Sequence, residues 1–137
     1  MATHKKTWTE KLHSGKDPVV KPAPIDIAGM KAGQIMLVPN ARLVDQFVRK
    51  IPEGKSMSIP KFRANMAQAH NAEVSCPITT GILMRIVAEA AFEAYEAGAD
   101  LADLTPVWRV LDENVPTLKK LSFDPEFLLN LRKQEGL

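Results

Sequence analysis

Residues 58–97, SIPKFRANMAQAHNAEVSCPITTGILMRIVAEAAFEAYEA, decide the fold that this sequence predicts. Ser58 is a suitable N-cap for a helix that has Pro60 in its first turn. A short connection then leads to the longest helix of the chain, which we expect Thr79 or Thr80 to cap. Apolar residues recur at helical spacing on one side of both segments. Two helices joined in this way predict a helix-turn-helix.

Weaker patterns surround this stretch. Helical spacing of apolar residues predicts another helix that begins at Asn40 and ends before Pro52. Residues 105–111 have the composition of a strand, and residues 112–124 are expected to form a loop. A last helix is predicted from Asp124 until shortly before the end of the chain.

These elements predict a mainly α fold, a winged-helix-like helix-turn-helix domain with a short strand and wing. We assign residues 40–137 to this domain and residues 1–39 to an N-terminal arm packed over it, rich in lysine, proline and glycine. Within the arm, residues 8–12 suit a short helical turn, and residues 34–38 suit a short strand or an extended segment. The prolines at 22–24 argue against regular structure there.

Composition narrows the class of protein. The chain has 137 residues, 45% of them hydrophobic and 25% charged, as in an ordinary soluble domain. It has no apolar run long enough to cross a bilayer, no signal peptide pattern and a single cysteine, so we expect a cytoplasmic protein without membrane contact. Residues 1–85 carry a net charge of +7 (13 Lys/Arg, 6 Asp/Glu) and residues 86–137 one of −5 (5 Lys/Arg, 10 Asp/Glu). This asymmetry is a weak indication of a polyanionic partner, although it also arises by chance.

Motifs for metal, cofactor or phosphate chemistry are absent. The histidines His4, His13 and His70 are scattered and cannot complete a metal site with one cysteine, so we expect neither metal nor cofactor. The acidic residues of the long helix, at 89, 93 and 96, are interpreted as a solvated face. Cys76 is either a reactive thiol, activated near the start of the long helix, or a buried inert one. We favour the inert thiol.

Four short motifs occur in an order that resembles a known family. They are IPEGKSMS at 51–58, TTG at 79–81, PVWRV at 106–110 and LLNLRKQEG at 128–136. Together they resemble the C-terminal DNA-binding domain of alkylguanine-DNA alkyltransferases. In those proteins an Ile-Pro-x-Gly-Lys-Val-x-Thr-Tyr motif precedes a helix-turn-helix. A Pro-Cys-His-Arg motif follows, which contains the acceptor cysteine, and a Leu-Leu-x-x-Glu-Gly motif ends the domain. The likeness covers residues 44–136 and is greatest to small bacterial members with Cys-Pro-x-Thr-Thr-Gly.

The departures from the family pattern alter the function that the resemblance implies. Between Pro106 and Arg109, the acceptor cysteine is replaced by Val107 and the activating histidine by Trp108. Valine has no lone pair with which to attack an alkyl carbon, so alkyl transfer at this position is excluded. Trp108 is interpreted either as a stacking surface for a base or as a core residue.

Two further positions of the family motif are changed and one is kept. Ile59 occupies the place of the family's tyrosine, and the intercalating arginine falls at Thr80-Gly81. Glu135 matches the acid that orients the family's histidine. The resemblance therefore implies an acceptor-less, alkyltransferase-like protein that binds DNA without repairing it, and that senses alkylated or damaged bases.

The expected DNA contacts follow from the helix-turn-helix, whose second helix enters a groove with its N-terminal end. That end also favours phosphate. Basic residues on the preceding segment and on the predicted wing would add phosphate contacts that weaken with salt. The expected contact residues are Lys55, Lys61, Arg63, Thr79, Thr80, Gly81, Arg85, Lys119 and Lys120.

Two other functions remain open. The acidic second half and the missing intercalating arginine favour a protein-interaction module on the same scaffold. The thiol of Cys76 would, if reactive, indicate a thiol-dependent enzyme.

Overall fold

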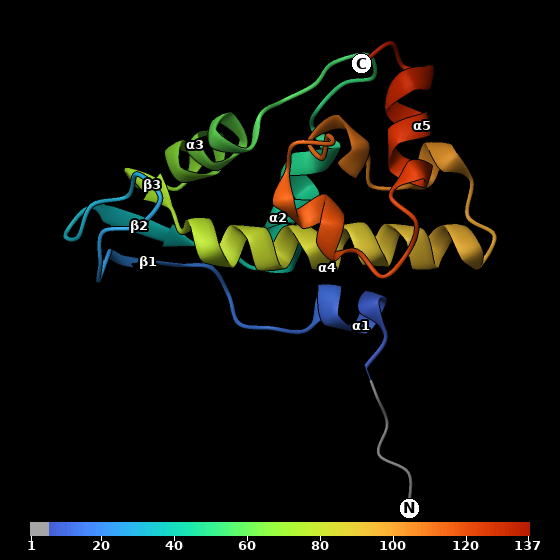
Figure 1. Cartoon of the computed structure of the whole chain (residues 1–137). Helices are drawn as coiled ribbons and strands as arrows, with labels where there is room; N and C mark the ends of the chain where they lie inside the picture. The colour runs from blue at the N-terminus through green and yellow to red at the C-terminus, as the bar shows by residue number, and fades with distance from the viewer. Residues whose placement is uncertain (1–5) are drawn as a thin grey trace, which may run out of the picture.

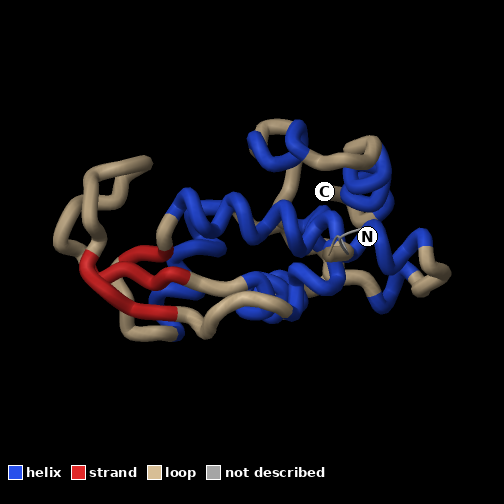
Figure 2. Tube along the Cα trace, turned by 90° about the horizontal axis from the view of Figure 1, so that it is seen from below, coloured by secondary structure: helices blue, strands red, loops and turns tan. Residues whose placement is uncertain are grey.

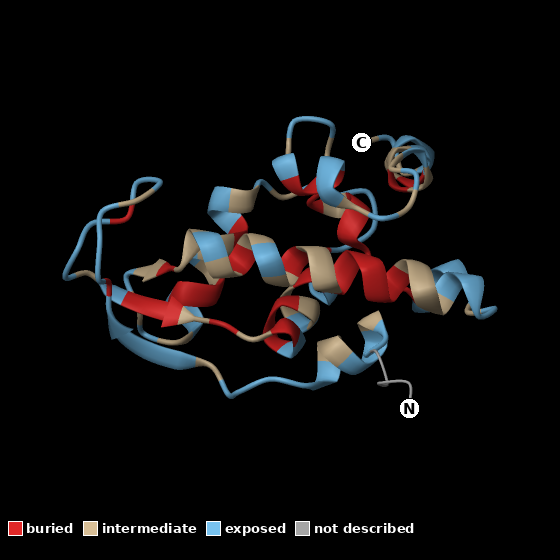
Figure 3. Cartoon of the chain, turned by 60° about the horizontal axis from the view of Figure 1, so that its bottom comes forward, coloured by how far each residue is buried: buried red, intermediate tan, exposed pale blue. Residues whose placement is uncertain are grey.

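The long helix α4 (Pro77–Glu96) is the centre of the molecule, and the other helices pack around it (Figure 1). The computed structural model of the protein describes residues 6–137, so the first five residues of the predicted arm lie outside the described part. Helices α1 (Trp8–His13) and α2 (Ala41–Arg49) both contact α4. The middle turns of α4 are buried by these neighbours, while its C-terminal end is exposed (Figure 3).

Two helices begin where local capping chemistry places them. Helix α2 is capped by Asn40, whose Oδ1 accepts the Leu43 amide at 2.9 Å. Helix α3 (Ile59–Ala69) is capped by Ser58, whose Oγ accepts the Lys61 amide at 3.3 Å. Both predicted helices and both predicted caps are confirmed.

The arm contributes two strands to a small sheet at one end of the molecule (Figure 2). Strand β1 (Val19–Pro22) pairs antiparallel with β2 (Ile35–Val38), and β2 pairs in parallel with the two-residue strand β3 (Val74–Ser75). Neighbouring residues of β2 are buried in different clusters, Leu37 in the main core and Met36 with residues of the arm.

The predictions for the arm are partly confirmed. Helix α1 and strand β2 form where the sequence predicted a helical turn and an extended segment. The expectation of irregular backbone at 22–24 is wrong at its first residue, because Pro22 ends strand β1. Since β1 lies at the edge of the sheet, a residue without an N–H is tolerated there.

The C-terminal third is built from short turns and one helix. Its elements are the 3-10 helices η1 (Leu101–Asp103), η2 (Val107–Arg109) and η3 (Pro116–Lys120), followed by α5 (Glu126–Gln134).

The predicted strand at 105–111 is wrong. The segment contains the 3-10 turn η2, in which the carbonyl of Val107 accepts the amides of Val110 and Leu111 at 3.0 and 2.9 Å. A strand would point residues 107 and 110 to opposite faces. Both are instead buried in the same core, at 0% and 2% exposure, and only a turn brings them there. The segment 112–124, predicted to be a loop, contains the 3-10 helix η3.

The start of the long helix also differs from the prediction. Helix α4 begins at Pro77, with Cys76 as its N-cap, rather than after Thr79 or Thr80. The order of helix, turn and helix over 58–97 is nevertheless present, with β3 inside the turn. The fold is mainly α, as expected. Within residues 6–137, no helix has the length and apolar character required to cross a membrane.

Candidate nucleic-acid interface

A groove of about 1,000 Å³ lies beside the N-terminal half of α4. The start of α3 forms one wall with Ile59, and the segment 110–120 forms another with Val115. Gly81 lines the groove from α4, and Trp8 lines it from α1. We call this feature the α3–α4 groove. It brings together two positions that the motif analysis singled out separately, Ile59 and Gly81.

The lining of the α3–α4 groove is largely apolar. Ile78 and Ile82 on α4 are 51% and 60% exposed, unusually high fractions for large aliphatic side chains. Three basic side chains also line the groove, and we call Lys11, Arg85 and Lys120 the cationic rim. The groove is therefore mostly apolar and is lined by three basic side chains and by the acidic Asp112.

Arg85 is held in place by two neighbours. Its guanidinium carbon lies 5.3 Å from the centre of the Trp8 ring, and its Nε lies 3.5 Å from Glu89 Oε2. The Nζ of Lys11 lies 4.1 Å from the centre of the same ring. Trp8 thus holds two members of the cationic rim together through cation–π contacts. The predicted DNA contact at Arg85 faces the groove.

The N-terminal end of α4 differs from the prediction in one side chain. Thr80 is 1% exposed, and its Oγ1 donates to the carbonyl of Cys76 at 2.7 Å, so this hydroxyl is not available to DNA. Helix α4 has no side-chain cap. The amides of its first turn, at Ile78 and Thr79, are thus left for an external acceptor such as phosphate.

The other predicted basic contacts divide into exposed and internal side chains. Lys55, Lys61 and Lys119 are exposed, the last beside Lys120 of the cationic rim. Arg63 instead donates from Nε and a terminal nitrogen to the carbonyl of Ser75 at 3.3 and 3.1 Å.

The Arg63 side chain is an internal connection between α3 and β3. The hydroxyl of Ser75 donates back to the carbonyl of Arg63 at 2.7 Å. Burial lowers the pKa of Arg63, and the charge of Cys76 opposes that shift. The expectation that Arg63 contacts DNA is not supported, because its hydrogen bonds serve the fold.

The acidic residues of α4 are not a solvated face, contrary to the prediction. Glu89 is only 2% exposed and accepts hydrogen bonds from the amide and hydroxyl of Ser122 at 2.7 and 2.5 Å. Glu93 accepts from the amides of Trp8 and Thr9 at 3.1 and 3.0 Å and from the Thr9 hydroxyl at 2.7 Å. Glu96 alone of the three is exposed. Glu89 therefore attaches the segment around Ser122 to α4, and Glu93 attaches the start of α1.

Glu93 fixes the start of α1. The hydrogen bond from the Thr9 hydroxyl lowers the pKa of Glu93, the amide bonds add to this effect, and burial opposes it. Because α1 carries Trp8 and Lys11, this carboxylate indirectly positions one side of the α3–α4 groove.

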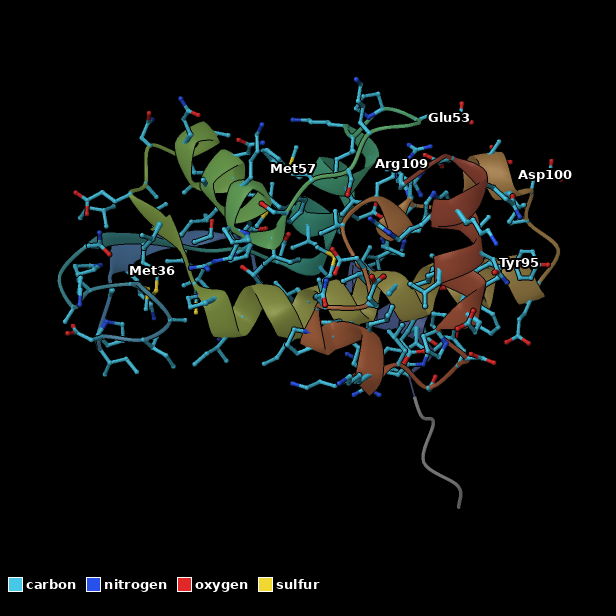
Figure 4. The ribbon with its side chains drawn as sticks, turned by 45° about the horizontal axis from the view of Figure 1, so that its top comes forward. Met36, Glu53, Met57, Tyr95, Asp100 and Arg109 are labelled. Atoms are coloured by element: carbon cyan, nitrogen blue, oxygen red, sulfur yellow. The ribbon has the colours of Figure 1, made fainter. Side chains whose placement is uncertain are left out.

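The Pro-Val-Trp-Arg motif forms a separate cluster around Glu135. Trp108 Nε1 donates to Glu135 Oε2 at 2.6 Å, and Arg109 Nε donates to Glu135 Oε1 at 2.9 Å. The Gly54 amide donates to the same carboxylate at 2.8 Å, and Arg109 also donates to the carbonyl of Ile51 at 2.8 Å. Figure 4 shows Arg109 beside the turn that contains Glu53.

The burial and hydrogen bonds of this cluster indicate that it stabilises the fold. Trp108 is 5% exposed and Val107 is fully buried, so of the two interpretations of Trp108 the structure supports the core residue. Pro106 is buried with them. Burial raises the pKa of Glu135, but the hydrogen bonds from Arg109, Gly54 and Trp108 and the charge of Arg109 outweigh it and lower that pKa from 4.5 to about 2.

Cys76 is partly buried at the junction of β3 and α4. Its amide donates to the carbonyl of Leu37 at 2.9 Å. His70 Nδ1 lies 3.0 Å from the carbonyl of Met66, and no hydrogen bond joins this imidazole to the thiol. Among the described residues no group of three His, Cys, Asp or Glu is placed to hold a metal ion, and His4 lies outside them.

Sequence reasoning missed four residues of the site, Trp8, Lys11, Ile78 and Ile82. The two isoleucines could not have been found from their spacing, because the sequence pattern places Ile82 in the apolar stripe of the long helix, and only the structure shows that it is 60% exposed. Trp8 and Lys11 could not either, because nothing local in the sequence indicates which part of the domain the arm contacts.

Comparison with known proteins gives no relative: no family model, no curated protein and no solved structure matches this chain. The resemblance to the alkyltransferases consequently rests on the ordered motifs and remains a prediction.

Proposed function

We propose that this protein binds DNA non-covalently through the α3–α4 groove and senses alkylated or damaged bases without repairing them. The observation that carries the proposal is that the cationic rim of Lys11, Arg85 and Lys120 lines the same largely apolar groove as the N-terminal end of α4. The two lysines of the rim would neutralise phosphates, the charge of Arg85 being partly offset by Glu89, and the uncapped end of α4 would offer its amides to a further phosphate.

The apolar lining favours a modified base over a normal one. A volume of about 1,000 Å³ is at the upper end of ligand pockets and accommodates an unpaired base. An added alkyl group would be removed from water against Ile59, Val115 and their neighbours, which favours its binding.

The proposal excludes alkyl transfer because of the side chains at the Pro-Val-Trp-Arg motif. Val107 offers no nucleophile and is fully buried, while Trp108 gives its N–H to Glu135 instead of activating a thiol. We infer that the Glu135 cluster, which performs chemistry in the family that the motifs resemble, serves stability in this chain.

Little sequence preference is expected. None of the accessible side chains on the first two turns of α4 carries the amide or guanidinium group that reads base edges; they are Pro77, Ile78, Thr79, Ile82 and Leu83. Affinity would therefore come mainly from phosphate contacts.

The direct test is fluorescence anisotropy with two labelled duplexes, identical except for one O6-alkylguanine. We expect binding at micromolar protein that weakens steeply with salt, and tighter binding to the alkylated duplex. Absence of salt-dependent binding to either duplex contradicts the proposal.

Intact-mass measurement after incubation with the alkylated duplex separates binding from transfer. We expect an unchanged protein mass. A gain of one alkyl group would contradict the non-covalent mechanism, and its location on Cys76 would support the thiol-dependent alternative.

A protein-interaction module remains the second candidate, favoured by the exposure of Ile78 and Ile82. A stoichiometric partner that binds wild type, does not bind an Ile82→Asp variant and is indifferent to DNA would favour this function over the first.

A further inference from the structure

We propose that the surface at the C-terminal end of α4 binds a basic segment of another protein, one in which arginine or lysine side chains lie close together. This surface lies at the opposite end of α4 from the small sheet (Figure 1). It is separate from the α3–α4 groove, which the N-terminal half of α4 lines. The inference therefore goes beyond the proposed function and does not depend on it.

Two segments that meet at this end carry acidic side chains and no lysine or arginine. They are residues 92–102, from the last turns of α4 onward, and residues 121–130, which include the start of α5. Their five acids are Glu93, Glu96, Asp100, Asp124 and Glu126. Glu93 is bound to α1, whereas the other four are exposed. We call these four exposed acids, together with Tyr95 and Leu101, the acidic end.

Four aromatic rings join the two segments. The ring of Phe92 stacks on that of Phe123 with their centres 4.2 Å apart, and the rings of Tyr95 and Phe127 lie 4.7 Å apart. All four side chains remain partly exposed, and Tyr95 and Leu101 are exposed by 41% and 43%. Because the rings support one another, the acidic end offers an ordered apolar surface to a ligand.

The carboxylates of the acidic end are not used by the fold. Within residues 6–137, those of Glu96, Asp100 and Glu126 make no ion pair and accept no hydrogen bond. Figure 4 shows Asp100 and Tyr95 at the same end of the molecule. Like charges gathered around an apolar surface repel one another, which lowers stability. A feature that costs stability and serves no internal contact is typical of a binding surface.

The chemistry of the acidic end selects its occupant. Nucleic acid would be repelled by the four carboxylates. A single metal ion does not fit, because no group of three His, Cys, Asp or Glu in the described part of the chain is placed to hold one. A basic polypeptide segment matches both the charge and the exposed ring. We expect arginine to be favoured over lysine, because its planar guanidinium stacks on an aromatic ring such as that of Tyr95.

The first test measures fluorescence anisotropy of labelled octa-arginine and octa-lysine peptides with the full chain. We expect both peptides to bind with an affinity that falls with salt, and octa-arginine to bind more tightly. Glu96→Gln/Asp100→Asn should weaken both complexes by about fivefold and reduce their salt dependence. Glu53→Gln/Glu113→Gln is the matched control, because it removes the same charge at exposed positions outside the acidic end and should bind as wild type does.

The second test separates the aromatic contact from charge. Tyr95→Ala should weaken octa-arginine binding by about two- to fivefold, remove most of the preference for arginine and leave the salt dependence unchanged. Tyr95→Phe keeps the ring and should keep the preference. Circular dichroism of both variants shows whether the fold is retained, and Tyr95→Phe keeps the test decisive if the alanine variant unfolds, because loss of the preference in that folded variant would contradict stacking on the ring.

The outcomes distinguish the possible occupants. Equal peptide affinities for Glu96→Gln/Asp100→Asn and its control would overturn the proposal. Sedimentation velocity tests the chain alone, which we expect to be independent of the acidic end. Self-association of wild type that is lost in Glu96→Gln/Asp100→Asn would assign this end to a second copy and overturn a separate basic partner. DNA binding is measured with different probes, so either proposal can fail while the other stands.

Discussion

Trp108 donates its indole N–H to Glu135 across 27 residues of sequence, at a distance of 2.6 Å. The same carboxylate also accepts hydrogen bonds from the Arg109 guanidinium and from the amide of Gly54. One acid thereby joins the turn before α3, the 3-10 helix η2 and the end of α5. Since Trp108 is almost wholly buried, this acceptor satisfies a polar group that water does not reach.

Glu135→Gln should destabilise the protein by about 2 kcal/mol. The amide keeps the shape of the side chain but loses the charge that Arg109 and Trp108 both contact, and hydrogen bonds to charged groups are the stronger ones. Urea unfolding followed by circular dichroism measures the change. Glu113→Gln, at an exposed position, is the control and should unfold as wild type does.

The contribution of Glu135 should depend on pH. Its pKa is lowered from 4.5 to about 2, so the folded state holds this proton less tightly than the unfolded state. Its stabilisation is therefore complete above pH 4.5 and is lost as pH falls toward about 2. We expect the difference in stability between wild type and Glu135→Gln to shrink over this interval. A difference that stays constant would contradict the shift.

The parts of the fold that depend on local chemistry were predictable from the sequence. Asn40 and Ser58 cap helices α2 and α3 through hydrogen bonds to amides three residues ahead, and those residues are adjacent in the chain. The prediction of a strand at 105–111 was wrong because the β-branched residues of this segment lie in a turn that is buried in the core. Tertiary packing decided that segment, and no local pattern reveals it.

The site was predictable to a smaller extent, for the same reason. Arg85 and Lys120 line the groove as the helix-turn-helix suggested, but Thr80 lies inside the first turn of α4 and faces inward, because the helix is capped at Cys76, three or four residues before the predicted Thr79 or Thr80. The spacing of Glu89 and Glu93 in the sequence is typical of the solvent-exposed side of a helix. The donors that hydrogen-bond to these two carboxylates lie 33 or more residues away, so the pattern alone could not show that the carboxylates have partners in the fold.

Arg63→Met should lower stability by about 1–3 kcal/mol, because the carbonyl of Ser75 loses a charged donor between α3 and β3. If DNA binds as proposed, the slope of its affinity against salt should not change, since this guanidinium points inward. Chemical unfolding and salt titration measure the two effects. Lys61→Gln, exposed on the same helix, should leave stability unchanged, and a stable Arg63→Met with a reduced salt slope would reverse our assignment.

Glu93→Ala should release α1 while leaving the core folded. The amides of Trp8 and Thr9 lose their acceptor, so their hydrogen exchange should accelerate while that of the α4 core stays slow. The pKa of Glu93 is lowered, so in wild type the attachment is strongest with the carboxyl ionised and weakens as acid protonates it. Glu96→Ala, on the next exposed turn, should keep both amides protected.

Lys120→Gln should reduce the salt dependence of DNA binding with little effect on stability. Each phosphate contact contributes about 0.9 to the slope of log affinity against log salt concentration on duplex DNA, so loss of one rim lysine should lower the slope by about that amount. Lys21→Gln is the matched control, because Lys21 is exposed on strand β1 and does not line the groove. Anisotropy titrations from low to moderate salt give both slopes. Equal slopes for the two variants would show that phosphate contacts are spread over the whole surface, and the cationic rim would then not be the interface.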